Sequence, residues 1–537
     1  MNDLADRIHT IAHDDFGHDR LLTGQEETIA ALGNGEDVLL VAPTGAGKSL
    51  TYLVAGRLLD GPVVVVSPLL ALEQDQVDAV TAAPTPVAAA RLSSAESAAQ
   101  RRAALEQAAA GEVGYLFCSP ELLADDDVRS ALADLRPVLV AVDEAHCVAA
   151  WGHDFRPDYQ RLGAVVEDLG RPPVLATTAT AAAPVRAEIA ERLRMRSPRT
   201  VVTGFARPEI ALDVRRCRDE AEQTEAVVGV VADHAKAGEA GLVYARTRPA
   251  VEELAERLAG ELDVPVGAYH GGLSRTRREA VQESFMDGST PVVVATSAFG
   301  MGVDKPDVRF VVHAQVPGSP DVYWQEAGRA GRDGEPATAT LMYRPEDLGL
   351  GRYFSGGVPS ATDLRRVLAA CDTPPEEADA AALAEDLPFG RRKTGKLLNL
   401  LELGVARLDG EDDPTPSAIV DSAREVAEAQ RALELSRVDM IRAYAETGRC
   451  RAEYLLAYFG EVGEACGHCD SCRSGSAAEH AHDDDSPYTV DETVTHPTFG
   501  EGTVTDVTDG EVTVLFDEAG YRTIDATLAE EKDLLTG

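Results

Sequence analysis

The sequence is short of positive charge. Its 537 residues include 91 Asp and Glu against 50 Lys and Arg, which gives a formal net charge of −41 at pH 7. This balance at first argues against a nucleic-acid ligand, because phosphate binding depends on basic side chains. Local potential governs binding, however, and an acidic chain can carry positive grooves. The basic residues that could form them are grouped as Arg246/Arg248, Arg275/Arg277/Arg278 and Arg391/Arg392/Lys393/Lys396.

Long apolar runs are also missing. We find no stretch of about 18 apolar residues, so we expect no membrane span. The segment Met1–Thr10 contains Asp3 and Asp6 and lacks the apolar core of a secretory signal, which predicts a cytoplasmic protein. The chain is nevertheless 44% hydrophobic. At about 100–200 residues per domain, its length predicts three to five domains.

Cysteines are few, and half of them are scattered. We expect the scattered four to be reduced structural thiols: Cys118, Cys147, Cys217 and Cys371. The others, Cys450, Cys466, Cys469 and Cys472, form the pattern C-x15-C-x2-C-x2-C. Closely spaced cysteines with a fourth from a preceding helix suit tetrahedral Zn²⁺. His468 is a competing ligand, and an iron–sulfur cluster is the alternative metal group.

Short apolar runs alternate with helical patterns in two successive stretches, 36–200 and 241–345. This alternation predicts an α/β fold with two parallel, doubly wound sheets and a cleft between them. The predicted strands of the first stretch are Val38–Val41, Val63–Ser67, Gly114–Cys118, Val138–Val142 and Val174–Thr177. Those of the second stretch are Gly241–Ala245, Val264–Tyr269, Pro291–Ala295, Phe310–Ala314 and Ala339–Tyr343.

The remaining third of the chain changes pattern. Arg391–Leu408 is a basic helix with Leu spacing, expected to lead into a short strand as in a winged helix; a packed helical hairpin is the alternative. The composition of 473–487 is typical of a linker. Alternating patterns at Gly502–Val507 and Glu511–Phe516, around Gly turns, predict a small SH3-like β-barrel over 488–537.

A phosphate loop follows the first predicted strand. The run from Ala42 to Ser49, A-P-T-G-A-G-K-S, lies between a strand and a helix, where backbone N–H groups can cradle phosphates. Lys48 would reach the β and γ phosphates of ATP, and the Ser49 hydroxyl would hold Mg²⁺. The predicted nucleotide-binding set in this loop is Thr44, Gly45, Gly47, Lys48 and Ser49.

A pair of acidic residues ends the fourth predicted strand. Val138–Val142 leads directly into Asp143-Glu144-Ala-His146. Asp143 would hold the magnesium ion through its shell, and Glu144 would orient or deprotonate the attacking water. An exposed acid pair without function is the plain alternative, and the phosphate loop upstream argues against it.

Several longer segments resemble the RecQ family of superfamily 2 helicases. The segments similar to the family's helicase motifs are Ser67–Val77, Thr177–Thr180, Ala295–Lys305 and Tyr323–Gly334, and Tyr454–Gly460 with Cys466–Cys472 resembles its zinc module. The resemblance implies two RecA-like lobes, here 1–205 and 206–350. The further divisions we expect are a winged-helix-like segment 351–412, a zinc module 413–475, a linker 476–487 and the barrel 488–537.

The resemblance also implies roles for individual residues. Gln25 would read the adenine edge, although Leu21-Leu-Thr23 replaces the family's usual Phe-Arg-Pro beside it. Arg332 would be the arginine finger on the γ phosphate, Arg329 would support it from the same helical face, and His146 completes the catalytic set. The segment 147–159 resembles the family's aromatic loop, in which Trp151, Phe155, Arg156 and Tyr159 would contact DNA bases and phosphates. Burial of Trp151 and Phe155 in a core is the alternative.

By this resemblance the chain is an ATP-dependent DNA helicase acting in repair or recombination. It would translocate 3′ to 5′ on single-stranded DNA and separate partly duplex DNA, with ATP, Mg²⁺ and Zn²⁺ as cofactors. Two rivals stay open: an RNA helicase, and an ATP-switched binding factor recruited to transcription. One departure from the family is the interval of 118 residues (450 − 332) between Arg332 and Cys450.

The C-terminal segment carries its own resemblance. Val494–Val504 is similar to the Tudor-like tail of some superfamily 1 helicases and transcription-repair factors, which implies contact with RNA polymerase. From Glu479 onward, 16 acidic and 2 basic residues give 2 − 16 = −14. So acidic a segment repels phosphates, which predicts a protein partner and a tail dispensable for DNA binding.

Overall fold

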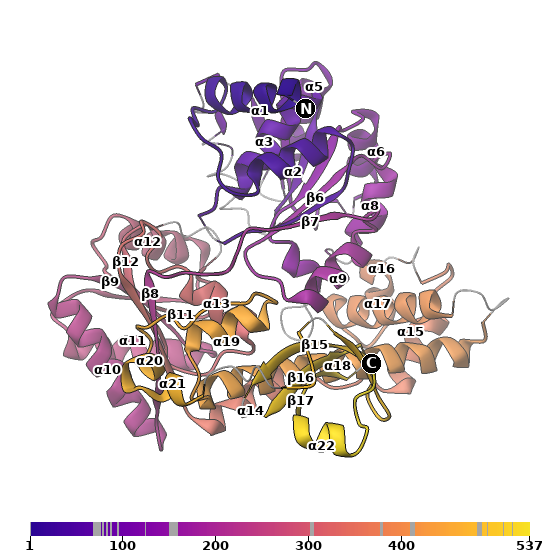
Figure 1. The fold of residues 1–537 in the computed structure, drawn as a ribbon. Helices are drawn as coiled ribbons and strands as arrows, with labels where there is room; N and C mark the ends of the chain where they lie inside the picture. Colours follow the sequence, from indigo (N-terminus) through magenta and orange to yellow (C-terminus); the bar gives the residue numbers. More distant parts are fainter. Residues whose placement is uncertain are drawn as a thin grey trace.

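The computed structural model shows two lobes, a helical part, a cysteine-bearing segment and a C-terminal sheet (Figure 1). Lobe 1 lies at the top of this view, lobe 2 at the left, helices α15 to α17 at the right, and the C-terminal sheet below. The residues that the structure describes are 2–43, 45–67, 77, 80–81, 84–85, 88–93, 96–123, 125–149, 159, 161–300, 305–375, 378, 380–408, 414–480, 486–490, 492–508, 510–517 and 519–537.

Lobe 1 contains a seven-stranded parallel sheet in the order β3-β4-β2-β5-β6-β1-β7. Its inner strands are buried at every residue, because helices cover both faces of the sheet. The strands are β1 (Val38–Val41), β2 (Val63–Val66), β3 (Ala89–Leu92), β4 (Tyr115–Cys118), β5 (Leu139–Val142), β6 (Val174–Thr178) and β7 (Arg199–Val202). The helices are α1 (Asn2–Asp14), α2 (Gln25–Gly33), α3 (Lys48–Leu59), α5 (Ala98–Ala109), α6 (Asp126–Asp134), η1 (Ala145–Ala149), α8 (Leu162–Asp168) and α9 (Ala183–Arg192).

Lobe 2 repeats this architecture with a six-stranded parallel sheet in the order β10-β11-β9-β12-β13-β8. The two predicted parallel-sheet lobes are therefore confirmed. The strands are β8 (Ile210–Arg216), β9 (Ala240–Tyr244), β10 (Val266–Tyr269), β11 (Val292–Ala295), β12 (Val308–His313) and β13 (Ala337–Tyr343). The helices are α10 (Glu220–Lys236), α11 (Arg248–Glu261), α12 (Arg275–Met286) and α13 (Pro320–Ala327), and η3 (Pro345–Asp347) follows β13.

A helical part with its own core follows lobe 2. Its helices are α14 (Leu348–Phe354), α15 (Ala361–Ala370), α16 (Ala380–Asp386), α17 (Arg391–Arg407) and the long α18 (Pro416–Glu446). The described residues of 351–412 contain no strand, so the wing expected after the basic helix is not found there. Instead α17 packs along α18 as a helical hairpin, with Gly404 so close to α18 that a Cβ would lie 2.7 Å from the Ala423 nitrogen. The packed helical hairpin, which the sequence left open as the alternative to a winged helix, describes this region better, because the leucines of α17 are buried in the core that it shares with α18.

Two small elements complete the chain. The cysteine-bearing segment comprises α19 (Arg451–Tyr458), α20 (Asp470–Ser474) and α21 (Ser476–Glu479). The C-terminal sheet is antiparallel, with its strands joined in chain order: β14 (Thr493–His496), β15 (Gly500–Thr508), β16 (Glu511–Phe516) and β17 (Gly520–Asp525), followed by α22 (Ala526–Glu531). This sheet confirms the predicted β character of the C-terminus.

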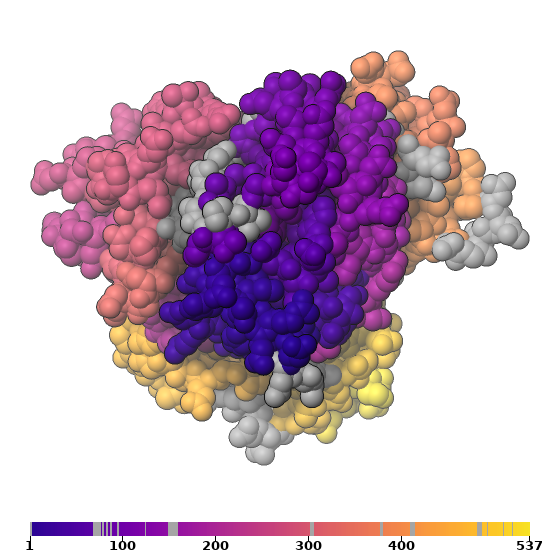
Figure 2. Space-filling view, turned by 90° about the horizontal axis from the view of Figure 1, so that it is seen from above, coloured from indigo at the N-terminus to yellow at the C-terminus, as the bar shows by residue number. Residues whose placement is uncertain are grey.

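The two lobes, the helical part, the cysteine-bearing segment and the C-terminal sheet pack against one another. Seen from above, lobe 1 lies between lobe 2 and the helical part (Figure 2). One cluster of buried side chains runs from lobe 1 through lobe 2 into α18, α19 and Tyr521 of the C-terminal sheet. Among the described helices, none combines the length and apolar character that crossing a membrane requires. The C-terminal sheet, which the sequence predicted as a separate module, is thus joined to the main core.

Candidate functional site: a two-lobed nucleotide site and a cysteine cluster

The predicted phosphate loop connects the buried strand β1 to the first turn of α3. Gly45 and Gly47 have left-handed backbone, with φ of 86° and 64°, which residues with a Cβ adopt only at a cost. A Cβ on Gly45 would meet no atom within 4 Å, so space is open beside the loop. Ser49 is the second residue of α3, and Thr44 lies outside the described residues. The loop therefore has the helix N-terminus and the open space that an anion needs.

Lys48 begins α3 and turns back over this loop. Its Nζ donates hydrogen bonds to the backbone oxygens of Ala42 at 3.0 Å and Pro43 at 3.3 Å. Burial lowers the pKa of Lys48, while the nearby carboxylates of Glu144 and Asp143 raise it. Both acceptor oxygens belong to the phosphate loop. Lys48 can therefore exchange these hydrogen bonds for hydrogen bonds to phosphate oxygens without losing a contact to another helix or strand. The position fits the predicted role of Lys48.

Gln25, at the start of α2, braces the same loop. Its Nε2 donates to the backbone oxygens of Gly47 at 2.9 Å and Ala46 at 3.2 Å, and its Oε1 accepts from the Leu22 N–H at 2.8 Å. A Cβ on Gly47 would stand 2.7 Å from Gln25 Nε2. Gln25 thus contacts the nucleotide loop directly, and its reading of adenine stays a prediction.

The acid pair lies at the carboxyl end of β5, beside the end of β6. Asp143 Oδ1 accepts hydrogen bonds from Thr177 Oγ1 at 2.7 Å and from the Glu144 N–H at 3.0 Å. Strand β6 lies between β5 and β1, so three neighbouring strands deliver the acid pair, Thr177 and the phosphate loop to one edge. The sequence placed Thr177 in a segment similar to a helicase motif and missed its hydrogen bond to Asp143.

Glu144 is held in a strained and strongly charged setting. Its backbone φ is 49°, in the left-handed region that costs a residue with a Cβ about 1–2 kcal/mol. Burial alone would raise the pKa of Glu144, but the hydrogen bond and charge of His146, with Lys48 and Arg329, outweigh burial and lower that pKa to about 2. A carboxylate with so low a pKa is a weak base. Glu144 is therefore better suited to orient the attacking water than to deprotonate it.

His146 links the acid pair to lobe 2. Its Nδ1 lies 3.2 Å from Glu144 Oε2 and 3.2 Å from Thr178 Oγ1, and its Nε2 lies 3.5 Å from the side-chain nitrogen of Gln325 on α13. Burial would lower the pKa of His146, yet Cys147 and Glu144 raise it well above its ordinary value. The sequence gave Gln325 no role, because nothing in its own segment identifies a partner 179 residues away.

The two predicted arginines follow α13 in lobe 2. Because α13 ends at Ala327, they lie in the turn after the helix, and the expectation of one shared helical face is wrong. Arg329 is buried, donates through Nη1 to the Gly300 oxygen and lowers the pKa of Glu144 by its charge. Arg332 is near enough to lower the pKa of Lys48. The charges of both arginines are therefore close enough to lobe 1 to shift the pKa of its catalytic residues.

The predicted DNA-contacting loop can be checked at one of its four residues. Tyr159 is fully buried in the main core. A ring enclosed in this way has no face available to a base, so the predicted DNA contact of Tyr159 is wrong, and this residue belongs to the core. Trp151, Phe155 and Arg156 lie outside the described residues.

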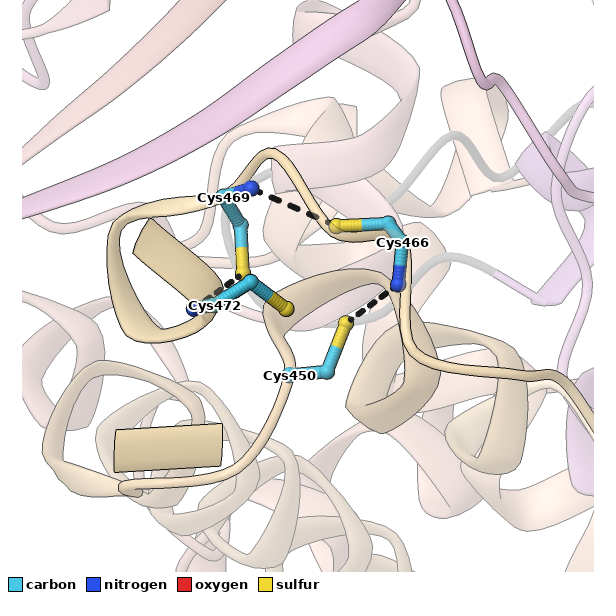
Figure 3. A group of neighbouring side chains, drawn as sticks. All are labelled: Cys450, Cys466, Cys469 and Cys472. Atoms are coloured by element: carbon cyan, nitrogen blue, oxygen red, sulfur yellow. Dashed lines mark hydrogen bonds between the residues drawn. The ribbon is translucent and has the colours of Figure 1, made fainter. Parts of the chain in front are cut away.

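The four clustered cysteines converge from two helix starts and the loop between them (Figure 3). Their Sγ atoms all lie within 4.8 Å of one another. Tetrahedral Zn²⁺ with Zn–S bonds of about 2.3 Å requires sulfurs roughly this close. Backbone N–H groups point at the sulfurs: that of Cys466 at Cys450 Sγ (3.2 Å), that of Cys469 at Cys466 Sγ (3.3 Å) and that of Cys472 at Cys469 Sγ (3.4 Å). The donor set and its spacing fit zinc.

The cluster is complete without His468, the competing ligand. His468 Nδ1 lies 2.7 Å from the Cys466 backbone oxygen and Nε2 lies 3.3 Å from the Ile210 backbone oxygen, so both ring nitrogens are engaged. Ile210 begins β8, the edge strand of lobe 2. Nearby, Arg473 pairs with Asp213 of β8 at 2.7 Å. His468 and Arg473 thus connect the cysteine-bearing segment to the edge strand of lobe 2.

Comparison with known families defines the class of protein. Residues 23–188 match the DEAD/DEAH box helicase family, and residues 222–334 match the helicase conserved C-terminal domain. Together with two parallel-sheet lobes that share one nucleotide site, these matches make the protein a two-lobed helicase of the DEAD/DEAH class. Residues 412–473, which hold the four cysteines, match the RecQ zinc-binding family.

The chain belongs to the RecQ family of helicases. It is 34% identical over 468 residues to the probable ATP-dependent DNA helicase RecS of Bacillus subtilis, covering 84% of this chain and 90% of that protein. It is also 34% identical over 482 residues to the ATP-dependent DNA helicase RecQ of Synechocystis, covering 86% of this chain and 97% of that protein. Other curated relatives are longer, and matches with two of them span 62% and 52% of their length.

Solved structures show the same fold. The DUF1998 helicase MrfA bound to DNA aligns with a TM-score of 0.55 at 21% identity, covering 66% of this chain and 54% of that one. At this identity the likeness extends to the fold alone.

The match to the RecQ zinc-binding family and the geometry of the four cysteines agree, so these cysteines form a zinc site. A helicase of this class uses ATP and Mg²⁺.

Proposed function

We propose that this protein is an ATP-dependent DNA helicase that moves along single-stranded DNA. The observation that carries the proposal is the division of the nucleotide site between lobes. Lys48, Asp143 and Glu144 belong to lobe 1, whereas Arg329 and Arg332 belong to lobe 2. A site of this kind is complete only when the lobes are together, so binding and hydrolysis of ATP change the contact between them.

The residues divide the chemistry among themselves. Lys48 and the loop amides would neutralise the phosphates. Asp143, held by Thr177, would hold Mg²⁺ together with the Ser49 hydroxyl. When bound, that ion offsets negative charge on the phosphate oxygens. Glu144 would orient the attacking water, and Arg332 would stabilise charge on the γ phosphate in the transition state. Release of the γ phosphate would remove the anion that Arg332 would contact, and the lobes could then separate.

DNA is the proposed substrate because the relatives matched over most of their length are named DNA helicases. The RecQ-type zinc segment also favours DNA over RNA. The assembled acid pair and arginines make an ATP-switched factor without unwinding activity the weaker alternative. On the family resemblance we propose 3′ to 5′ movement, a role in repair or recombination, cytoplasmic location, and contacts of Trp151, Phe155 and Arg156 with bases and phosphates.

A strand-displacement assay tests this function. The full chain is given ATP and duplexes with a 3′ or a 5′ single-stranded tail, and the same duplexes in RNA serve as the matched comparison. We expect displacement of the 3′-tailed DNA, little of the 5′-tailed DNA, and stronger stimulation of ATP hydrolysis by DNA than by RNA. Hydrolysis stimulated by RNA alone would establish the rival function, and hydrolysis without displacement would establish the ATP-switched factor.

The acidity of the C-terminal segment supports a second, separate proposal. Its net charge of −14 from Glu479 onward disfavours DNA phosphates and favours a basic protein surface. On the Tudor-like resemblance we name RNA polymerase as the partner to test first. A pull-down of the polymerase with the full chain, compared with a full chain in which the exposed residues Glu501, Asp517 and Glu530 are replaced by their amides, tests the contact; equal recovery by both chains refutes it.

A further inference from the structure

Asp321 occupies an unusual place in lobe 2. It lies in the first turn of α13, the helix that precedes Arg329 and Arg332, and its side chain is buried. Oδ2 accepts hydrogen bonds from Arg437 Nη2 on α18 at 2.9 Å and from the Tyr458 hydroxyl on α19 at 2.6 Å. Burial alone would raise the pKa of Asp321, but these two partners outweigh burial and lower it. Three helices are therefore held together at one ionised carboxylate.

Tyr458 connects this carboxylate to the C-terminal sheet. Its ring stacks on that of Tyr521 in β17, with centroids 5.2 Å apart and planes inclined by 30°. Tyr521 is 4% exposed and belongs to the main core cluster rather than to the separate core of the sheet. A stacked, enclosed pair of rings leaves Tyr458 little freedom to turn its hydroxyl away from Asp321.

The backbone of the C-terminal sheet lies directly against α18. Gly520 precedes Tyr521 with φ of 70°, and a Cβ there would lie 2.4 Å from Ser436 Oγ and 3.0 Å from Leu433 Cα. A second contact joins buried Arg449 to Asp506 of β15. Figure 1 shows the same arrangement, with β15 to β17 lying over α18 below the lobes. The C-terminal sheet is thus packed against α18 and belongs to the same folded unit as the lobes.

Asp321 also faces lobe 1. The backbone N–H of Ala182, at the N-terminus of α9, favours the ionised carboxylate. The cap residue of α9 supplies no side-chain hydrogen bond of its own. Asp321 and Arg437 line a cavity of about 570 Å³ together with His146 and Arg329 of the nucleotide site. Asp321 therefore lies where both lobes, α18 and α19 meet.

We propose that the C-terminal sheet is a positioning element of the motor, which acts through Tyr521, Tyr458 and Asp321 on the helix before the two arginines. The inference rests on the proposed ATPase. Because α13 has only eight residues, a shift of its first turn moves the whole helix and the turn that follows it. Arginine fingers act on the transition state, so misplacement lowers kcat more than it raises KM. Asp321, Tyr458 and Tyr521 are positioning residues that touch no substrate.

The test measures DNA-stimulated ATP hydrolysis of the full chain with the variants Tyr521→Ala, Tyr521→Phe and Arg522→Ala. Arg522 is the matched control, because it neighbours Tyr521 but its guanidinium lies over the Phe499 ring. We expect Tyr521→Ala to lose about tenfold or more in kcat, since small displacements of catalytic groups have effects of that size. The KM for ATP should change less than about twofold. Arg522→Ala should stay near wild type, and Tyr521→Phe, which keeps the ring but removes the hydroxyl beside Tyr458, should lose less kcat than Tyr521→Ala.

A second comparison separates positioning from simple loss of structure. In an Arg332→Ala chain the finger is already gone, so adding Tyr521→Ala should cause little further loss of kcat. A merely structural role would lower activity by the same factor in both backgrounds, and that result would overturn the inference. So would a kcat of Tyr521→Ala within twofold of wild type. If Tyr521→Ala does not fold, Tyr458→Phe removes the hydroxyl alone and is measured in the same two backgrounds. Failure of the proposed function is distinct: the unaltered chain would then not hydrolyse ATP.

Discussion

The side-chain nitrogen of Gln325 lies 3.5 Å from Nε2 of His146, and this contact joins α13 of lobe 2 to the acid pair of lobe 1. The other ring nitrogen of His146 lies 3.2 Å from Glu144. One imidazole therefore touches both the residue proposed to orient water and the helix that precedes the arginines. Any movement of α13 changes the surroundings of Glu144 directly.

Replacement of Glu144 by Gln should abolish hydrolysis while the fold stays intact. The amide keeps the shape of the side chain but is uncharged and offers one acceptor oxygen instead of two, so it cannot orient the water in the same way, and we expect a loss of roughly 10²–10⁴ in kcat. Glu106→Gln, an exposed change on α5, is the matched control. Steady-state ATPase assays and circular dichroism of both variants provide the check; turnover of Glu144→Gln near that of wild type would remove it from the catalytic set.

The stability that the pair of Glu144 and His146 contributes should depend on pH. The pKa of Glu144 is lowered to about 2 from an ordinary 4.5, so the stability from its pairing is present above pH 4.5 and is lost as pH falls toward 2. The pKa of His146 is raised, so its contribution is present below pH 6.5 and is lost as pH rises through that raised value.

Replacing His146 by Ala removes the main group that keeps Glu144 ionised, and burial then raises the pKa of that carboxyl. We expect the acidic limb of the kcat/KM profile to move to higher pH. Gln325→Ala, which leaves the Glu144 pair in place, is the control and should keep the limb where it is in wild type. An unshifted limb in His146→Ala would contradict the role of this pair.

One zinc ion per chain should be bound, and it should be required for the cysteine-bearing segment. Structural zinc sites contribute about 10–16 kcal/mol of apparent binding free energy, which becomes folding free energy. Cys469→Ser should lose the metal and loosen α19 and α20, whereas Cys371→Ser, in the helical part, should keep it. Elemental analysis of native protein decides the matter, and iron in place of zinc would refute the assignment.

Two aromatic residues of the segment 147–159 should respond differently to replacement. Trp151→Ala should reduce stimulation of ATP hydrolysis by single-stranded DNA without changing basal hydrolysis, because a stacked base is worth about 1–3 kcal/mol. Tyr159 is fully buried, so Tyr159→Ala should instead lower the free energy of unfolding by about 3–5 kcal/mol. DNA titrations of activity and denaturant unfolding separate the two effects. Unchanged stimulation in Trp151→Ala would show that this residue does not sense DNA.

The ion pair between Arg449 and Asp506 should hold the C-terminal sheet in place. The Arg449 side chain is 5% exposed, and Glu453 remains 3.3 Å away as a second partner. Asp506→Ala should therefore cost about 1–3 kcal/mol, less than breaking an isolated buried pair. Thermal unfolding gives the measurement, with the exposed Asp517→Ala as control. Equal midpoints for the two variants would show that this contact does not hold the sheet.

The strands that could be predicted from the sequence differ physically from those that could not. Ten predicted runs of the two lobes match strands. Nine of these are inner strands, which are buried on both faces and form continuous apolar runs, and the tenth, β10, is an edge strand. The unpredicted strands all lie at sheet edges, where one side meets solvent or another element and the apolar run is lost. They are β3, β7, β8, β14 and β17, among which β7 has only Val201 buried.

The site divides in a similar way. The phosphate loop, the acid pair and the cysteines are contiguous or closely spaced, so local patterns identify them. The contacts of Asp321 with Arg437 and Tyr458 join residues 116 and 137 positions apart, and no local pattern encodes them. Tyr159 was misassigned because burial depends on the packing of its neighbours rather than on its own segment.

Helix α18 has 31 residues, and at 1.5 Å per residue it is about 46 Å long. It contacts α13 of lobe 2, α15 and α17 of the helical part, and β17. A rod of this length converts a rotation of a few degrees at one end into a displacement of several ångströms at the other. Distances between probes on α17 and on α1 of lobe 1 should therefore report each step of the nucleotide cycle in single-molecule fluorescence, far from any nucleotide contact.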